Sequence, residues 1–340
     1  MYPVGLFGVK TQAEESTVIL IPVPWDLTTS YGGGTARGPE TILQASPQLD
    51  LFDRDFPKAR QASYHLLPIP DHLLKLNDRL RPHVMAIRDY FATDEDGVLP
   101  PDLAKLAEEV NQACDGMCTW VYTQAREWLG KGKIVASVGG DHSTPFGLIR
   151  ALAEKHKSQF GILHVDAHAD LRQGYQSFRH SHASIMYNVM NASWRPTRLV
   201  QVGIRDFCQA EFEMIEARSD ITTFFDSDLK AQTFAGQSWQ QVVRPIVEAL
   251  PEKVYVSFDI DGLEPTFCPS TGTPVPGGLT FDAAVYLLKA VLASGRQVVG
   301  FDLNEVAPAS EPGNEWDGNV GARLLYKLCG MAASSSKAGG

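Results

Sequence analysis

Short runs of mostly apolar, often β-branched residues recur along the whole chain and constrain its fold more than any other feature. The runs are Val18–Val23, Ile134–Val138, Phe160–Val165, Leu199–Val202, Val254–Phe258 and Gln297–Phe301. None shows the strict alternation of apolar and polar residues that marks a strand with one solvent-facing side. We therefore expect strands buried on both faces, which is typical of a parallel sheet covered by helices on both sides.

Helical patterns lie between these runs. Residues 101–129 open with a proline and an aspartate, carry apolar residues at steps of three and four, and end at Gly130. Similar patterns extend over 209–219, 237–250 and 281–294. Strands that alternate with helices form βαβ units, so we predict an α/β fold.

One domain accounts for most of the chain. We expect it to span residues 1–330, because the irregular stretch 54–80, which holds three prolines, is interpreted as a surface loop and no second core begins there. The tail, 331–340, is rich in Ser, Ala and Gly, and we expect it to be disordered. No apolar run approaches the length of a membrane span and the N-terminus does not resemble a signal peptide, so we expect no membrane association and a cytoplasmic location.

The charge balance and the cysteine content argue against several functions. The chain carries 30 Lys and Arg residues against 40 Asp and Glu residues, a net charge of −10. An acidic chain repels phosphate backbones, so we expect no nucleic-acid partner, whereas it would attract a metal ion or a cationic substrate. The five cysteines show no C-x-x-C spacing and do not suggest a thiolate zinc site or a disulfide framework.

Three of the predicted strands end in clusters of Asp and His. Gly139–Ser143 reads GGDHS, Asp166–Asp170 reads DAHAD, and Asp259–Gly262 reads DIDG. Ligands of open α/β sheets bind beyond the carboxyl ends of the strands, so we expect the three clusters to share one site. A single Asp-x-Asp is more often a helix cap or a turn, but three such clusters at three strand ends favour a metal site.

The second cluster is the most informative. Titratable residues alternate with small or apolar ones along His164–Asp170, so four polar side chains share one face of an extended segment. Such crowding is unfavourable without a bound cation. The candidate ligands are His142, Asp166, His168, Asp170, Asp259 and Asp261. One zinc ion needs only three or four ligands, so we expect two divalent ions, Mn²⁺ first and Ni²⁺, Co²⁺ or Zn²⁺ as alternatives, and hydrolysis by the water that they activate.

Several motifs resemble those of a known family. Val138–Ser143, His164–Asp170 and Ser257–Leu263 resemble the three metal motifs of the ureohydrolases, which include arginase, agmatinase, formiminoglutamase and guanidino-acid hydrolases. Further matching segments are Pro24–Asp26, Gly34–Pro39, Gly203–Arg205, Thr271–Leu279 and Asp302–Pro308, and the resemblance covers Val18–Gly330. It implies the arginase/deacetylase-like fold, a three-layer αβα arrangement around a parallel sheet of about eight strands. It also implies a homo-oligomer, either a trimer or a hexamer.

The resemblance further implies roles for individual residues. The six candidate ligands would hold the two metal ions, and His164 would lie behind them as a hydrogen-bonding partner. Asp170 would also help to move a proton to the departing amine. Glu305 would hold the guanidinium group of the substrate. His182 would act as a proton shuttle on a loop, with His180 as its competitor, because the length of this loop differs from the family pattern.

The implied reaction cleaves the C–N bond of a small cationic guanidino compound to urea and an amine. Agmatine, which would give putrescine, is the first candidate, because Pro24–Asp26 and Gly272–Pro274 resemble the agmatinase branch. Arg172 and Arg179 leave open a guanidino acid such as guanidinobutyrate or guanidinopropionate. Guanidine, small alkylguanidines, arginine and formiminoglutamate are further alternatives, and arginine is disfavoured because Ser177–His182 does not resemble the substrate loop of arginase.

Two other classes of protein are weighed against a ureohydrolase. A deacetylase-like amidohydrolase would use one zinc ion and an adjacent His–His pair, and no such pair exists in the sequence. An inactive partner subunit would carry degenerate ligands, whereas all six are present. The metal content of each chain, two ions, one or none, separates the three classes.

Overall fold

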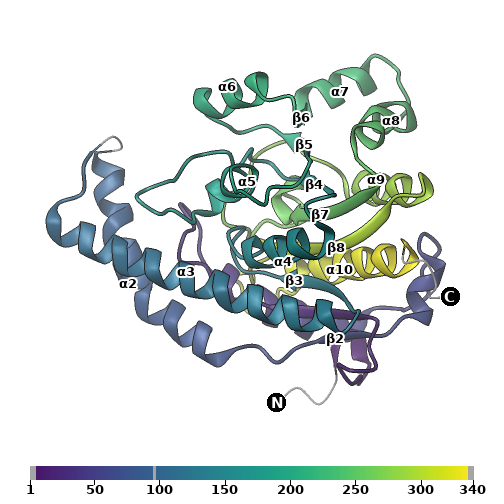
Figure 1. Cartoon of the computed structure of the whole chain (residues 1–340), viewed down its shortest axis with the longest axis horizontal. Helices are drawn as coiled ribbons and strands as arrows, with labels where there is room; N and C mark the ends of the chain where they lie inside the picture. Colours follow the sequence, from purple (N-terminus) through teal and green to yellow (C-terminus); the bar gives the residue numbers. More distant parts are fainter. Residues whose placement is uncertain (1–4, 95–96, 336–340) are drawn as a thin grey trace.

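The computed structural model describes residues 5–94 and 97–335, and within them it forms a single sheet of eight parallel strands (Figure 1). The strand order is β2-β1-β3-β8-β7-β4-β5-β6. The strands are β1 (Val18–Pro22), β2 (Tyr64–Leu66), β3 (Ile134–Val138), β4 (Gly161–Val165), β5 (Arg198–Ile204), β6 (Ile221–Phe225), β7 (Lys253–Asp259) and β8 (Gln297–Asn304). The sheet confirms the α/β fold with about eight parallel strands.

Helices connect the strands, as parallel pairing requires. They are α1 (Gly38–Ala45), α2 (Asp71–Thr93), α3 (Pro101–Gly130), α4 (Phe146–His156), α5 (Ile185–Met190), α6 (Gln209–Ala217), α7 (Asp226–Phe234), α8 (Trp239–Ala249), α9 (Phe281–Ala293) and α10 (Trp316–Ser335). None of the helices in the described ranges is long and apolar enough to cross a lipid bilayer.

Both faces of the sheet are buried, and the pleat of β1 shows how. Val18 and Leu20 pack into a core with residues of α1, α8, α9 and α10. Ile19 and Ile21 point to the other face and pack into a second core with residues of α2, α3, α4 and α5. A strand that alternates in this way between two dry layers needs apolar residues at every position. The structure thus has the predicted three layers.

The six strands predicted from apolar runs all lie in the sheet, and the two that were not predicted, β2 and β6, are its two edges. Edge strands bury less of their surface, so their sequences need not be uniformly apolar. The four residues of β6 after Ile221 are all only half-buried. Continuous apolar runs therefore predict the interior strands of this sheet but not its two edge strands.

The interpretation of 54–80 as a surface loop was wrong for much of its length. This stretch contains β2 and the first ten residues of α2, which begins at Asp71 directly after Pro70. The helix also holds a proline, Pro82, in its interior. A proline within a helical pattern normally marks its end, so the sequence concealed a helix of 23 residues.

The prediction that the tail, 331–340, is disordered was wrong for residues 331–335. Helix α10 continues through Ser335, and Met331 and Ala332 are fully buried. Ser335 also accepts a hydrogen bond at its hydroxyl from the Val298 backbone N–H at 3.0 Å. Small residues can pack closely against a sheet, so a segment rich in Ala and Ser extends the helix. Residues 336–340 lie outside the described residues.

A close approach of two backbone segments positions the loop after β3. The backbone N–H of Gly140 donates to the carbonyl of Val23 at 2.9 Å. A Cβ atom added to Gly140 would lie 1.7 Å from the carbonyl oxygen of Trp25, whereas one added to Gly116 in α3 would meet nothing within 4 Å. Only glycine fits at position 140, because the backbone of Trp25 leaves no room for a Cβ atom.

We expect Gly140→Ala to lower the free energy of unfolding by about 3 kcal/mol, because backbone atoms must shift to admit the methyl group. Gly116→Ala is the matched control and should raise it by about 0.5–1 kcal/mol, since alanine is the better helix former. Denaturant unfolding of both variants measures the difference. Equal stability of the two proteins would contradict the packing described for Gly140.

Candidate metal centre and substrate pocket

The six candidate ligands come together at the carboxyl ends of three strands. They are His142 after β3, Asp166, His168 and Asp170 after β4, and Asp259 and Asp261 at the end of β7. Strands β3 and β7 flank β8 in the middle of the sheet, and β4 lies on the other side of β7, so their ends meet at one place. All but His168 are buried, and the side chain of His168 is 23% exposed.

The cluster has two halves that share Asp166. In one half, Nδ1 of His142 lies 2.9 Å from Oδ2 of Asp166 and 3.2 Å from Oδ2 of both Asp170 and Asp259. In the other half, Nδ1 of His168 lies 3.4 Å from Oδ1 of Asp166 and 3.1 Å from Oδ2 of Asp261. The two oxygens of Asp166 therefore face different histidines, so Asp166 would belong to both halves of a two-metal site.

The electrostatics of the cluster fit bound cations. Burial, with the nearby Asp166 carboxylate, raises the pKa of Asp170 to about 7. Burial and Asp261 likewise raise the pKa of Asp259 well above its ordinary value. Oδ2 of Asp170 is buried and has no hydrogen-bond partner among the described residues. Ionised carboxylates that are crowded and buried in this way are unfavourable without a cation. Together with the imidazoles they form a donor set that suits hard or borderline divalent metal ions.

Two polar residues behind the cluster orient His142. Its Nε2 lies 2.9 Å from the hydroxyl of Ser257, which donates in turn to Oδ1 of Asp302 at 3.1 Å. This chain of hydrogen bonds directs Nδ1 of His142 toward the carboxylates. Neither residue was assigned a role from the sequence. The feature that could have identified them is a polar residue within a strand whose neighbouring residues are apolar and buried.

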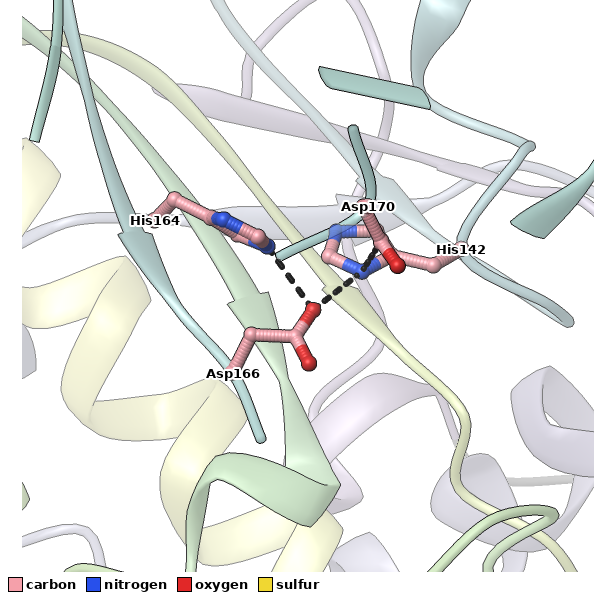
Figure 2. Close-up of side chains that lie close together, drawn as sticks. All are labelled: His142, His164, Asp166 and Asp170. Carbon is pink, nitrogen blue, oxygen red and sulfur yellow. Dashed lines mark hydrogen bonds and ion pairs between the residues drawn. The ribbon is translucent and has the colours of Figure 1, made fainter. Parts of the chain in front are cut away.

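His164 supports the cluster from outside the expected six (Figure 2). Its Nδ1 accepts a hydrogen bond from the amide nitrogen of Gln201 at 3.0 Å, while its Nε2 lies 2.7 Å from Oδ2 of Asp166. The amide is itself oriented by Ala169 and Thr223. Nε2 therefore carries the proton and donates to Asp166, so it has no lone pair for a metal ion.

Glu305 and Asp170 both hold unusual backbone conformations. Their φ angles are 62° and 54°, in the left-handed region that residues other than glycine rarely adopt. Oε1 of Glu305 accepts a hydrogen bond from the backbone N–H of His142 at 2.9 Å. Its Oε2 is buried and has no hydrogen-bond partner in the described chain. Strain of this kind is often found at functional sites, and the free oxygen is available to a ligand.

Of the two loop histidines, the structure places His182 at the pocket. Nδ1 of His182 lies 3.4 Å from Oε1 of Glu305, and its Nε2 accepts from the backbone N–H of Ser30 at 3.3 Å. His180 points away, with Nε2 at 3.1 Å from Oδ1 of Asp115 in α3. Burial lowers the pKa of both imidazoles, so the neutral form of each is favoured.

A cavity of about 320 Å³ opens above the cluster. His168, Asp170 and His182 lie in its wall together with Asp206 and Tyr31. This cavity joins the candidate metal ligands to residues that the sequence analysis did not select. Asp206 follows the matched segment Gly203–Arg205 directly, and its position there was the available signal.

The wall formed by the loop after β1 is held in place by α2. Arg81 donates to the hydroxyl of Thr29 at 3.0 Å, and Asn77 donates to Oδ1 of Asp26 at 3.0 Å. Arg88, about two helical turns beyond Arg81, donates to the carbonyl of Tyr31. These side chains share one face of the helix. Because α2 was not predicted, its part in the pocket was not predicted either.

Comparisons with known proteins agree with this arrangement. The model of the Arginase family matches residues 16–330. An N(1)-aminopropylagmatine ureohydrolase of Thermus thermophilus is 33% identical over 331 residues, which cover 96% of this chain and 94% of that protein. An agmatinase of Cronobacter sakazakii is 31% identical over 292 residues, which cover 86% of this chain and 79% of that protein. The structure of proclavaminate amidino hydrolase from Streptomyces clavuligerus superposes with a TM-score of 0.73 at 22% identity and covers 99% of both chains.

We expect Asp166→Asn to lose both metal ions, because an amide offers one ligand oxygen where the carboxylate faces both halves of the cluster. Asp261→Asn should weaken chiefly the half that contains His168. Elemental analysis after dialysis measures the metal bound by each chain, with Asp228→Asn on the surface helix α7 as control. Retention of two ions by a folded Asp166→Asn variant would contradict the bridging role.

Proposed function

The chain belongs to the arginase family, and we propose that it hydrolyses the guanidinium group of agmatine, or of agmatine extended at its amine, to urea and an amine. The family is one of hydrolases that act on guanidino C–N bonds. The substrate class is supported by the names of the relatives, an agmatinase and an N(1)-aminopropylagmatine ureohydrolase. Both names denote guanidines with a cationic tail.

The observation that carries this proposal is the charge at the mouth of the pocket. Asp206 lies in the cavity wall with a side chain that is 67% exposed, and its nearest ionic partner is Nε2 of His168 at 4.0 Å. Within the described ranges no Lys or Arg pairs with this carboxylate, which lies beside the candidate metal cluster. An ammonium group at the end of an aliphatic tail is its complement.

The two arginines that left a guanidino acid open have different surroundings. Nε of Arg172 lies 3.6 Å from Oε2 of the buried Glu211, and its guanidinium stacks 4.6 Å from the ring centre of Tyr175. Arg179 pairs with Glu108 at 2.8 Å and with Asp115 at 3.1 Å, on the side of α3. Arg179 thus pairs away from the cavity, whereas Arg172 lies in the cavity wall. The amine tail is therefore supported by Asp206 and by the names of the relatives.

The residues of the pocket have distinct tasks in the proposed reaction. Oε2 of Glu305 would accept from the planar N–H donors of the guanidinium and so fix the reacting carbon over the cluster. Asp170 would help to move a proton to the departing amine, and His182 would exchange protons with the pocket. Two divalent ions held by the six ligands would supply an activated water at neutral pH.

We further propose that the two ions are Mn²⁺, because four carboxylates and two imidazoles without a thiolate form a donor set that suits this ion. Ni²⁺ and Co²⁺ are the alternatives. A homo-oligomeric assembly in the cytoplasm also remains part of the proposal. Activity after reconstitution of metal-free protein with each ion in turn tests the choice of metal.

Urea release should be highest with agmatine or N1-aminopropylagmatine, because a cationic tail meets Asp206. Guanidinobutyrate, guanidinopropionate and arginine carry a carboxylate and should be poor substrates, and guanidine, which has no tail, should bind weakly. A urea assay over this panel measures the order. Preference for a guanidino acid would contradict the substrate class, and urea from none of them would contradict the proposed activity.

Glu305→Gln should lower kcat/KM for agmatine by about a hundredfold, because a neutral amide replaces the carboxylate that accepts from the guanidinium. Most of this loss should appear as a higher KM if the contact forms in the bound substrate. Steady-state kinetics and metal content are measured together, with the exposed Glu248→Gln on α8 as control. Unchanged kinetics would exclude Glu305 as the guanidinium-binding residue.

A further inference from the structure

Glu211, in the first turn of α6, is a buried carboxylate to which the proposed reaction assigns no task. Its side chain joins two segments that lie far apart in the sequence. Oε1 accepts a hydrogen bond from the backbone N–H of Leu171 at 3.0 Å, and Oε2 accepts one from the backbone N–H of Cys208 at 2.9 Å. Nε of Arg172 lies 3.6 Å from Oε2. Hydrogen bonds to a carboxylate are stronger than those between neutral groups, so Glu211 ties the two segments together.

The first of these segments carries Asp170, whose φ angle of 54° is unusual for a residue other than glycine. The peptide group between Asp170 and Leu171 is held from both sides. Its N–H donates to Glu211, and its carbonyl accepts a hydrogen bond from the backbone N–H of Tyr187 in α5 at 3.0 Å. An unfavourable backbone conformation persists only where its surroundings fix it. Glu211 supplies one of the two hydrogen bonds that fix this one.

The orientation of this peptide group determines where the side chain of Asp170 points. Oδ2 of Asp170 lies 3.2 Å from Nδ1 of His142, and Figure 2 shows the two side chains close together. The same oxygen is buried and has no hydrogen-bond partner in the described ranges. With no such partner to hold it, this carboxylate depends for its position on the backbone that carries it.

The second segment carries Asp206, and its position does not depend on Glu211 alone. The backbone N–H groups of Arg205 and Asp206 both donate to the carbonyl of Ala167, at 2.8 and 3.0 Å. These hydrogen bonds keep Asp206 beside the strand end that carries His168. Loss of the carboxylate at position 211 should therefore release Asp170 and leave the half of the cluster around His168 in place.

We propose that Glu211 is a positioning residue that keeps Asp170 turned toward His142 and so serves one of the two metal ions. The inference rests on the proposed function, since Asp170 is both a candidate ligand and the group that would help to move a proton to the departing amine. Ser257 and Asp302 orient His142 through its side chain, whereas Glu211 orients Asp170 through its backbone.

Calorimetric titration of the metal-free protein with Mn²⁺ tests the proposal in the unaltered chain and in Glu211→Gln. The amide has nearly the same shape, but its NH2 group meets a backbone N–H where an oxygen accepted one. We expect two binding steps, of which one weakens about tenfold in the variant, as for the loss of a partner behind a metal ligand. Glu216→Gln, exposed on the same helix, is the matched control and should change neither step.

Asp261→Asn, which should weaken chiefly the half with His168, identifies the affected ion. If Glu211 serves the half with His142, the double variant Glu211→Gln/Asp261→Asn should bind both ions weakly. If the double variant still binds one ion as tightly as Asp261→Asn alone does, Glu211 serves the wrong half and the proposal is overturned.

Glu211→Asp separates the connection between the two segments from the charge at the start of α6. It keeps a carboxylate in the first turn of the helix, where it is favourable, but it is one methylene shorter and cannot span from Cys208 to Leu171. It should therefore weaken the same step as Glu211→Gln. Full Mn²⁺ binding by Glu211→Asp would show that the charge suffices and would overturn the proposal, as would equal weakening of both steps or of neither. Denaturant unfolding of each metal-free variant verifies that it is folded.

Steady-state kinetics with agmatine at saturating Mn²⁺ provide a second measurement. In Glu211→Gln we expect kcat to fall about tenfold because Asp170 is displaced, with KM unchanged because Asp206 stays in place. A higher KM with unchanged kcat would contradict the positioning of Asp170. Mn²⁺ binding of the expected kind without urea from any guanidine would overturn the proposed function and uphold the role of Glu211. Absence of Mn²⁺ binding by the unaltered chain would overturn both.

Discussion

The mutual repulsion of buried carboxylates at the centre of the sheet is the constraint on which the rest of the structure depends. Asp166, Asp170, Asp259 and Asp261 are buried close together, and burial raises the pKa of Asp170 to about 7 and that of Asp259 well above its ordinary value. Only a fold that brings the carboxyl ends of β3, β4 and β7 together with two imidazoles provides both the crowding and a donor set that divalent cations relieve.

The reacting end of the pocket and its entrance are built from different parts of the fold. The reacting end of the pocket is built from strand ends and from hydrogen bonds that run within the sheet, such as His142 to Ser257 to Asp302. The other end is built from the loop after β1, the loop after Asp170 and helix α2. Rigid strands fix the positions of reacting groups, whereas loops and a peripheral helix set the shape and charge of the entrance.

The sequence predicted what depends on local pattern. Continuous apolar runs identified the six interior strands, and the alternation after β4 identified three of the six candidate ligands, because period and burial are visible in the local sequence. The edge strands β2 and β6 were not predicted, because half-buried strands need not be continuously apolar. Helix α2 was not predicted, because a proline such as Pro82 normally marks the end of a helix. Arg172 and Arg179 illustrate a further limit. Whether an arginine is free or paired depends on distant partners, here Glu211, Glu108 and Asp115, and no local pattern reveals them.

Helix α2 contributes no candidate metal ligand, yet its Asn77, Arg81 and Arg88 hold the loop after β1, and its second half lines a cavity of about 660 Å³ next to the pocket. The helix thus shapes the entrance without taking part in the metal cluster. Its sequence can drift, or be exchanged for that of a relative, under selection for a new tail on the substrate, while the strand ends keep the same chemistry. When substrates diversify within such a fold, the sequence of α2 would then change sooner than the motifs by which the family is recognised.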